Sequence, residues 1–176
     1  MDIFVLVDMQ NDFLLPEGKL WIGHNTTEFV ARVEKTALTW GLVYGLLDTH
    51  QNYSCELKQW PGHCIEGTWG WKSVNDFYDK LCIPPIKKDG FVSYKLIQEI
   101  IKRLTIENCT IHFAGVLASI CVQENVAALY NLCKHEFNRL PNIVINPELI
   151  DDITSEAKEA AIKRMVTIYN VKIMGQ

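Results

Sequence analysis

The sequence predicts a doubly wound α/β fold, with a mainly parallel sheet of about six strands and helices on both faces. Short apolar runs rich in Val, Ile and Phe recur along the 176 residues, and longer segments with helical spacing separate them, which is typical of βαβ units. The first run, residues 3–8, is continuously apolar, as expected of a strand buried on both faces. Since a domain holds roughly 150 residues, the length predicts a single domain over residues 1–176.

The first half of the chain is predicted to alternate strands and helices. The expected strands are 3–8, 41–48 and a short one just before Lys87, after Pro84 and Pro85. Two helices are expected. Asn25 caps the first, with Glu28 three residues later, and its apolar face consists of Phe29, Val33, Ala37 and Trp40. The second is short and covers about 72–82. Residues 49 to about 71 are polar, aromatic and rich in Gly and Pro. Because this stretch is long for a connection in a compact domain, it is predicted to be functional.

The second half continues the alternation. The expected strands are 110–116, 143–145 and 165–173. The expected helices lie around 96–104, over 120–133, and over 156–164 with Thr154 as its cap.

Composition and charge exclude several classes of partner. The chain has 17 basic and 21 acidic residues and a net charge of −4. This balance does not indicate the excess of positive charge that is typical of proteins that bind nucleic acid or anionic membranes. Asp2 precedes the first apolar run and Asp8 interrupts it, so the run resembles neither a signal peptide nor a membrane span. We therefore expect a cytoplasmic protein whose six cysteines are reduced thiols.

Side chains that can act as acids, bases, nucleophiles or metal ligands stand at or just after the ends of four of the predicted strands. They are Asp8, then Asp48 and His50, then Lys87 or Lys88, then the segment 115–121, which ends in Cys121. In an open α/β sheet ligands bind outside the carboxyl ends of the strands, so these residues predict a site at one rim. The absence of GxGxxG, GxxxxGK and GxSxG motifs leaves dinucleotide binding, P-loop chemistry and a serine-hydrolase elbow without support.

Four segments carry a family resemblance. VDMQNDF (7–13), DTH (48–50) with WPGHCIEGTWG (60–70), KKDGFVSY (87–94) and GVLASICV (115–122) resemble, in order, the motifs of the nicotinamidase branch of the isochorismatase-like cysteine hydrolases. The second segment is the most specific, because it marks the metal-binding nicotinamidases. The resemblance implies hydrolysis of nicotinamide to nicotinate and ammonia through a thioester, a reaction of pyridine-nucleotide salvage.

The resemblance implies a catalytic triad. Cys121 is the implied nucleophile, Asp8 the group that takes and returns protons, and Lys88 the cation that tunes both. Lys88 is preferred to Lys87 because the family spacing places an aromatic residue three positions after the lysine, and Phe91 fits it. The helix start at Cys121 is also expected to lower the pKa of its thiol and favour the thiolate.

The same resemblance implies an oxyanion hole. It is formed by the backbone N–H groups of Leu117 and Cys121, with a cis peptide bond between Val116 and Leu117. Phe13 and Trp60 are expected to be the aromatic walls that hold a flat pyridine ring.

A metal site is predicted around the second motif. Asp48 and His50 alternate at a strand end and can face one ion, and His63 returns to it from the long loop. One oxygen and two imidazole ligands suit a single divalent ion, with Zn²⁺ first and Mn²⁺ or Fe²⁺ as alternatives. The fourth ligand varies in the family, and Glu56 is preferred here over Ser54.

Some positions depart from the family pattern, and other functions remain open. Ser119 stands where the family usually has Asp, and Asn125 and Val126 stand where it favours Thr-Ala. These departures leave substrate preference open among small amides. The alternative functions are those of another small-amide or N-carbamoyl hydrolase, or of a catalytically silent metal-binding member. The expected partner is a small-molecule amide, and self-association as a homo-oligomer is left open.

Overall fold

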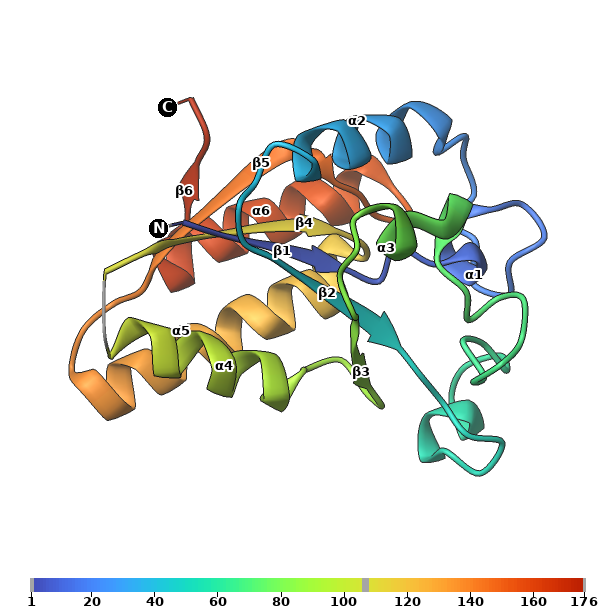
Figure 1. Cartoon of the computed structure of the whole chain (residues 1–176), viewed down its shortest axis with the longest axis horizontal. Helices are drawn as coiled ribbons and strands as arrows, with labels where there is room; N and C mark the ends of the chain where they lie inside the picture. Colours follow the sequence, from blue (N-terminus) through green and yellow to red (C-terminus); the bar gives the residue numbers. More distant parts are fainter. Residues whose placement is uncertain (1, 106–107, 176) are drawn as a thin grey trace.

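The computed structural model describes residues 2–105 and 108–175, which contain a six-stranded sheet (Figure 1). Its order is β3-β2-β1-β4-β5-β6, and each neighbouring pair runs parallel. The strands are β1 (Ile3–Val7), β2 (Val43–Asp48), β3 (Ile86–Lys88), β4 (Thr110–Gly115), β5 (Asn142–Ile150) and β6 (Lys172–Ile173). Because the order runs outward in both directions from the β1–β4 pair, the sheet is doubly wound, and the predicted fold class is confirmed.

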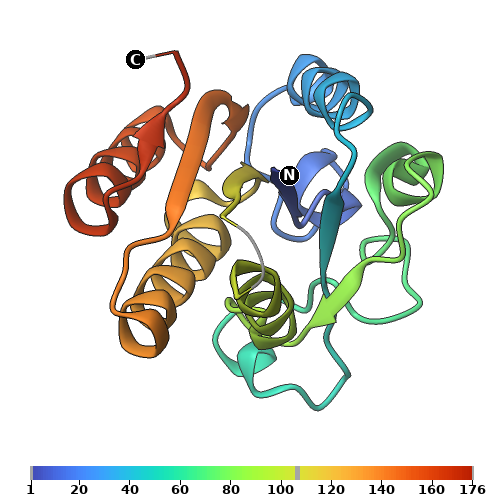
Figure 2. The ribbon, with the colours of Figure 1, turned by 60° about the vertical axis from the view of Figure 1, so that its left-hand side comes forward.

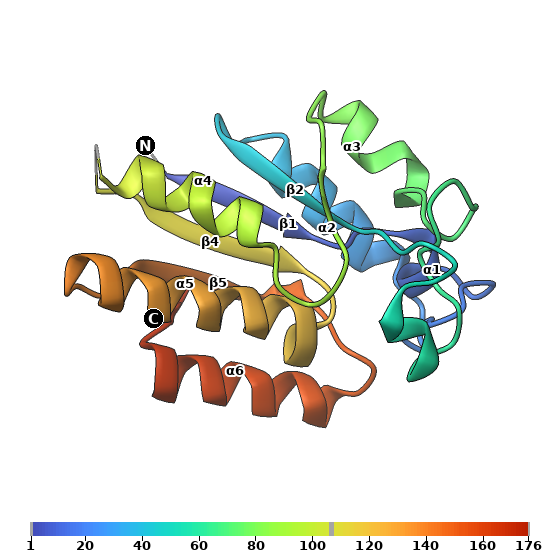
Figure 3. The ribbon, with the colours of Figure 1, turned by 90° about the horizontal axis from the view of Figure 1, so that it is seen from below.

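Helices cover both faces of the sheet. They are α1 (Asn11–Leu14), α2 (Thr27–Ala37), α3 (Phe77–Lys80), α4 (Tyr94–Leu104), α5 (Gln123–Phe137) and α6 (Ser155–Tyr169), with the short turns η1 (Cys55–Lys58), η2 (Val74–Asp76) and the π-helical η3 (Ala118–Val122). Figures 2 and 3 show α2 and α3 on one side of the sheet and α4 and α5 on the other. Among the described residues, no helix is long and apolar enough to cross a membrane.

The side-chain alternation of β1 builds the two halves of the core. Ile3, Val5 and Val7 pack into the cluster that also holds apolar residues of α4, α5 and α6. Phe4 and Leu6 point the other way, into the cluster that holds residues of α2 and α3. Every one of these side chains is buried, which explains why the run is apolar without interruption.

The predicted strand over 165–173 is wrong. Helix α6 continues to Tyr169, where Asn170 in the left-handed conformation ends it, and β6 is only Lys172–Ile173. Residues 165–169 are rich in β-branched and aromatic types and suggested a strand. However, Ala161, Met165 and Tyr169 recur at a spacing of four and pack on the core, so tertiary contact outweighs the local preference.

Other boundaries differ by smaller amounts. The cap position of α2 is Thr26, whose hydroxyl donates to the carbonyl of Leu14, while Asn25 accepts from the N–H of Thr27 in a local turn. The helix expected over 72–82 is reduced to α3 with the turn η2 before it, and β5 runs to Ile150, well past the predicted 143–145. Thr154 caps α6 as predicted, accepting from the N–H of Ala157 at 3.1 Å.

The carboxyl ends of the four adjacent strands meet at one edge of the sheet. Val7 pairs with Leu46 of β2 and with Gly115 of β4, while Asp48 of β2 pairs with Lys88 of β3. The residues that follow or end these strands are therefore neighbours in space.

The tight contact between β1 and β4 predicts that Gly115 tolerates no side chain. Its φ is +112°, and an added Cβ would lie 2.0 Å from the carbonyl oxygen of Val7. We expect Gly115→Ala to lower the free energy of unfolding by about 3 kcal/mol or more, measured by urea denaturation. Gly41→Ala is the matched control, since nothing lies within 4 Å of a Cβ there. Equal stability of the two variants would contradict the prediction.

Candidate active site

The side chains at this edge converge on Lys88, which ends β3 and is buried. Its Nζ lies 2.9 Å from Asp8 Oδ2 and 2.9 Å from Asp48 Oδ1, and it donates to Cys121 Sγ at 3.4 Å. Lys87, one position earlier, is exposed and pairs with Glu66. The alternation of β3 therefore turns Lys88, and not Lys87, into the site.

Gln10 fixes the main chain of Asp48 against the end of β1. Its Nε2 donates to the carbonyl oxygen of Asp48 at 2.8 Å, and its Oε1 accepts from the N–H of Asp48 at 2.7 Å. Gln10 is not among the predicted site residues, although it belongs to the first motif. Its role is visible only in the structure, where the amide is fully buried and therefore needs hydrogen-bond partners.

Burial and the Lys88 charge set the protonation of the carboxylates. Burial raises the pKa of Asp8, the Lys88 ammonium opposes it, and the net value is about 6. Burial also favours the neutral form of Asp48, but Lys88 and His50 outweigh it and hold the pKa of that carboxyl well below its usual range. The two carboxylates in turn overcome the burial of Lys88 and hold its pKa above the ordinary value. At neutral pH the site thus contains an ammonium between two carboxylates.

The expectation of a lowered thiol pKa at Cys121 is wrong for this geometry. Cys121 lies inside the π-helical turn η3 and is buried, and burial raises the pKa of its thiol well above the usual value. Lys88 opposes this shift, while the negative charges of Asp8 and Asp48 add to it. The thiol is therefore protonated at neutral pH, and reaction requires a base beside it.

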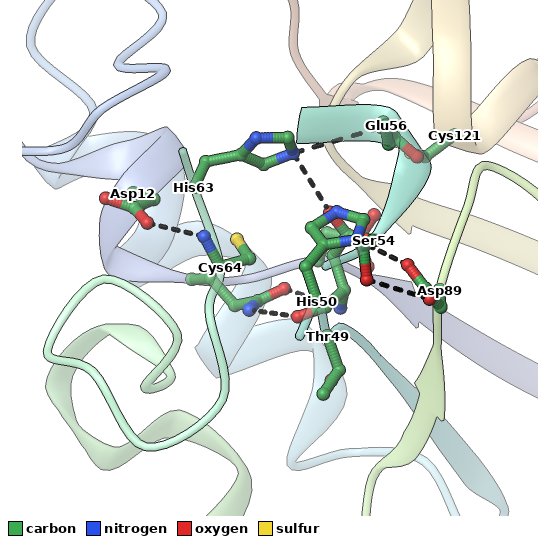
Figure 4. A network of polar contacts seen from close by, with 12 residues as sticks. Asp12, Thr49, His50, Ser54, Glu56, His63, Cys64, Asp89 and Cys121 are labelled. Carbon is green, nitrogen blue, oxygen red and sulfur yellow. Dashed lines mark hydrogen bonds and ion pairs between the residues drawn. The ribbon is translucent and has the colours of Figure 1, made fainter. Parts of the chain in front are cut away.

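Asp48, His50 and His63 form a compact set of metal-ligating atoms, all within 4.8 Å of one another. Asp48 Oδ2 lies 2.9 Å from His50 Nε2 and 3.4 Å from His63 Nε2. The opposite ring nitrogens have other partners. His50 Nδ1 is 2.6 Å from Asp89 Oδ1 (Figure 4), and His63 Nδ1 is 2.7 Å from the carbonyl oxygen of Pro61. One carboxylate and two imidazoles with their Nε2 atoms together fit a divalent ion of the zinc type.

The two candidates for a fourth ligand lie differently. Glu56 Oε1 is 3.9 Å from His63 Nε2, at the edge of the cluster. Ser54 instead donates to Asp89 Oδ2 at 3.0 Å and accepts from the N–H of Gln51 at 2.9 Å. The hydroxyl of Ser54 is thus engaged away from the cluster, which favours Glu56.

The long loop that carries His63 is fastened to α1. Asp12 Oδ2 accepts from the N–H of Cys64 at 2.7 Å, and Asn11 Nδ2 donates to the carbonyl oxygen of Trp69 at 2.8 Å. The N–H of Asp12 donates to the carbonyl oxygen of Gly70. Neither Asn11 nor Asp12 was predicted as a site residue, yet their hydrogen bonds set the path of the loop and hence the position of His63.

A pocket of about 210 Å³ borders both the group of residues that contacts Lys88 and the Asp48–His50–His63 cluster. Its lining includes Phe13, Asp48, Glu56, Trp60, His63, Leu117 and Cys121. The predicted aromatic walls, the predicted nucleophile and part of the candidate metal cluster therefore face one space. The peptide bond between Val116 and Leu117 is cis, as the resemblance implied.

Ser119 and Asn125, two of the positions that depart from the family pattern, form hydrogen bonds that hold the segments on either side of Cys121. The N–H of Ser119 donates to Asp152 Oδ2 at 2.6 Å, so a carboxylate from the segment after β5 lies at the start of η3. Asn125 donates to the carbonyl oxygens of Cys121 and Phe91 and accepts from the N–H of Ser93. Asn125 thus joins α5 to the loop that follows Lys88.

Solved structures with the same fold include three amidases. Nicotinamidase from Bacillus subtilis superposes with a TM-score of 0.83 at 20% identity, covering 98% of each chain. Pyrazinamidase of Pyrococcus horikoshii in complex with zinc gives 0.76 at 20% identity, covering 98% of each chain. N-carbamoylsarcosine amidase from Thermoplasma acidophilum gives 0.71 at 21% identity, covering 98% of this chain and 95% of that one.

Sequence comparison assigns the family. No curated protein sequence matches this chain significantly. The isochorismatase domain family matches residues 2–174, which is nearly the whole sequence. The chain therefore belongs to the isochorismatase family of hydrolases.

Proposed function

We propose that the protein is a metal-assisted cysteine amidohydrolase that converts nicotinamide to nicotinate and ammonia. The observation that supports this most strongly is the contact of Lys88 with Asp8, Cys121 and Asp48, because it joins a thiol and a base to the carboxylate of a metal cluster. The pocket of about 210 Å³ is below the ~300–1,000 Å³ of sites for drug-sized ligands, and so favours a small substrate.

In the first step Asp8 accepts the proton of the Cys121 thiol while Sγ attacks the carboxamide carbon. The negative charge on the carbonyl oxygen is stabilised by the backbone N–H groups of Leu117 and Cys121. Asp8 then gives the proton to the leaving nitrogen, the C–N bond breaks, and ammonia departs from a thioester. Lys88 remains protonated throughout and holds the Asp8 carboxylate in place.

In the second step a water molecule replaces ammonia. Asp8 takes one proton from the water as its oxygen attacks the thioester carbon, and the C–S bond breaks. The proton returns to Cys121 Sγ, and the product leaves as the carboxylic acid, which becomes nicotinate by giving the second proton of the water to solvent or ammonia. The reaction consumes one amide and one water and restores both protein groups.

Asp48, His50 and His63 would hold one divalent ion, with Glu56 as the candidate fourth ligand and Zn²⁺ as the first choice over Mn²⁺ or Fe²⁺. An ion held by these residues would supply a Lewis acid for the ring nitrogen of the substrate. Phe13 and Trp60 provide the apolar walls beside it. We place this reaction in cytoplasmic pyridine-nucleotide salvage.

The alternative functions receive less support. Hydrolysis of an N-carbamoyl compound or another small amide needs the triad but gives no role to a buried Asp-His-His cluster beside it. A catalytically silent member would have no need to bury an ammonium, a thiol and two carboxylates together, which is costly for stability.

The first prediction concerns the nucleophile. Cys121→Ala should reduce ammonia release from nicotinamide by about a thousandfold or more, because the substitution removes the thiol that Lys88 contacts at 3.4 Å. Circular dichroism and metal content should stay unchanged. The exposed Cys82→Ala is the matched control and should keep full activity. Retention of turnover by Cys121→Ala would remove this thiol from the mechanism.

The second prediction concerns pH. Since the pKa of Asp8 is raised to about 6, its base form is lost as the pH falls through this value. The value of kcat/KM for nicotinamide should therefore be constant near pH 7.5 and fall about tenfold per pH unit well below pH 6. Metal content is measured at each pH, because acid also protonates histidine ligands. A profile that is flat down to pH 5 with the metal retained would contradict Asp8 as the base.

The third prediction concerns the ring nitrogen. Benzamide has the shape of nicotinamide without that nitrogen, so its kcat/KM should be lower by about a hundredfold or more. Trp60→Ala should weaken both amides alike, because ring packing does not depend on the nitrogen. Comparable values for the two amides in the wild type would instead favour a different small amide as the substrate.

A further inference from the structure

Asp89, which follows the end of β3 at Lys88, makes a short contact with a histidine of the candidate metal cluster. Its Oδ1 lies 2.6 Å from Nδ1 of His50, whose side chain is completely buried. Its other oxygen, Oδ2, accepts from the hydroxyl of Ser54 at 3.0 Å. That hydroxyl accepts in turn from the N–H of Gln51 at 2.9 Å. A continuous chain of hydrogen bonds thus runs from the loop backbone to the imidazole (Figure 4).

This contact decides which nitrogen of His50 can bind a metal. When Nδ1 carries the proton and donates it to Asp89, the lone pair lies on Nε2, which faces Asp48 Oδ2 at 2.9 Å. A carboxylate partner also makes the imidazole a stronger donor to a metal than a neutral partner does. His63 lacks this advantage, because the partner of its Nδ1 is the neutral carbonyl of Pro61. The two histidines are therefore unequal as ligands.

We propose that Asp89 is a positioning residue of the metal site, and that Ser54 anchors it there. The carboxylate holds His50 in the tautomer and orientation that bind a divalent ion, while Ser54 keeps the exposed Asp89 side chain, which is 57% accessible, in contact with the ring. This gives Ser54 a defined role other than that of a ligand. The inference rests on the metal site of the proposed function but not on the identity of the amide substrate.

The test measures metal affinity in the absence of substrate. Dissociation constants for Zn²⁺ and Co²⁺ are obtained by competition with a chromophoric chelator for the wild type, Asp89→Ala, Asp89→Asn and Ser54→Ala. We expect Asp89→Ala to bind both ions about 10–100-fold more weakly. Asp89→Asn retains a neutral acceptor and should lose less, and Ser54→Ala should also lose less, because the carboxylate stays but is no longer anchored. Thermal unfolding of the metal-free proteins checks that each variant folds.

Glu66→Gln is the matched control. Glu66 is a nearby acid whose side chain pairs with Lys87 and with the side chain of Gln51. Its backbone N–H donates to the carbonyl oxygen of His50 at 2.9 Å, and the substitution leaves this main-chain bond in place. Loss of the Glu66 charge should leave the affinity for both ions unchanged. If Glu66→Gln weakened metal binding as much as Asp89→Ala does, the effect would be one of general charge, and the proposal would be overturned. Wild-type affinity in a folded Asp89→Ala would overturn it as well.

The outcome also separates this inference from the proposed function. If the wild type binds neither ion, both the role of Asp89 and the metal in the proposed reaction are wrong. If the affinities change as expected but nicotinamide is not hydrolysed, the role of Asp89 stands and the proposed substrate fails.

Discussion

The buried ammonium of Lys88 is the interaction on which the rest of the site depends. It comes from β3, yet it contacts Asp8 after β1, Asp48 at the end of β2 and Cys121 in the turn after β4. Removing one member of such a buried set leaves uncompensated charge, at a cost of about 3–5 kcal/mol. The same contacts keep Asp48 ionised. Burial raises the pKa of Asp8 and Lys88 opposes it, and the resulting value of about 6 is close to what a base working at neutral pH needs.

Asp48 divides its two oxygens between the two halves of the site. Oδ1 contacts Lys88, while Oδ2 faces His50 and His63. Gln10 holds the backbone of Asp48, so the carboxylate cannot turn toward one half without loss to the other. Lys88 and the next residue, Asp89, add a second link between the two halves, because Lys88 contacts Asp48 and Asp89 contacts His50. Cys121 and the Asp48–His50–His63 cluster are thus held near each other by buried side chains that are fixed at the ends of neighbouring strands.

Much of this arrangement is predictable from the sequence because it follows strand order. The continuous apolar run of β1 predicts a buried strand of an α/β sheet. Asp8 directly after β1, Asp48 at the end of β2 and Lys88 at the end of β3 then predict the edge at which these residues meet. Hydrogen bonds that depend on the path of a loop carry no periodic signal, so the roles of Gln10, Asp12 and Asp89 emerge only from the structure. The thiol pKa of Cys121 was predicted in the wrong direction, because a helix start is visible in the sequence and the depth of burial is not.

Interception of the acyl intermediate tests the central claim, attack of Cys121 on nicotinamide, most directly. The metal-loaded protein is given nicotinamide with and without hydroxylamine, a nucleophile that competes with water for a thioester, and the products are separated by chromatography. The account predicts that nicotinohydroxamate forms at the expense of nicotinate and that neither product forms with Cys121→Ala. Formation of nicotinate with no hydroxamate, or of no product by the wild type, would contradict it.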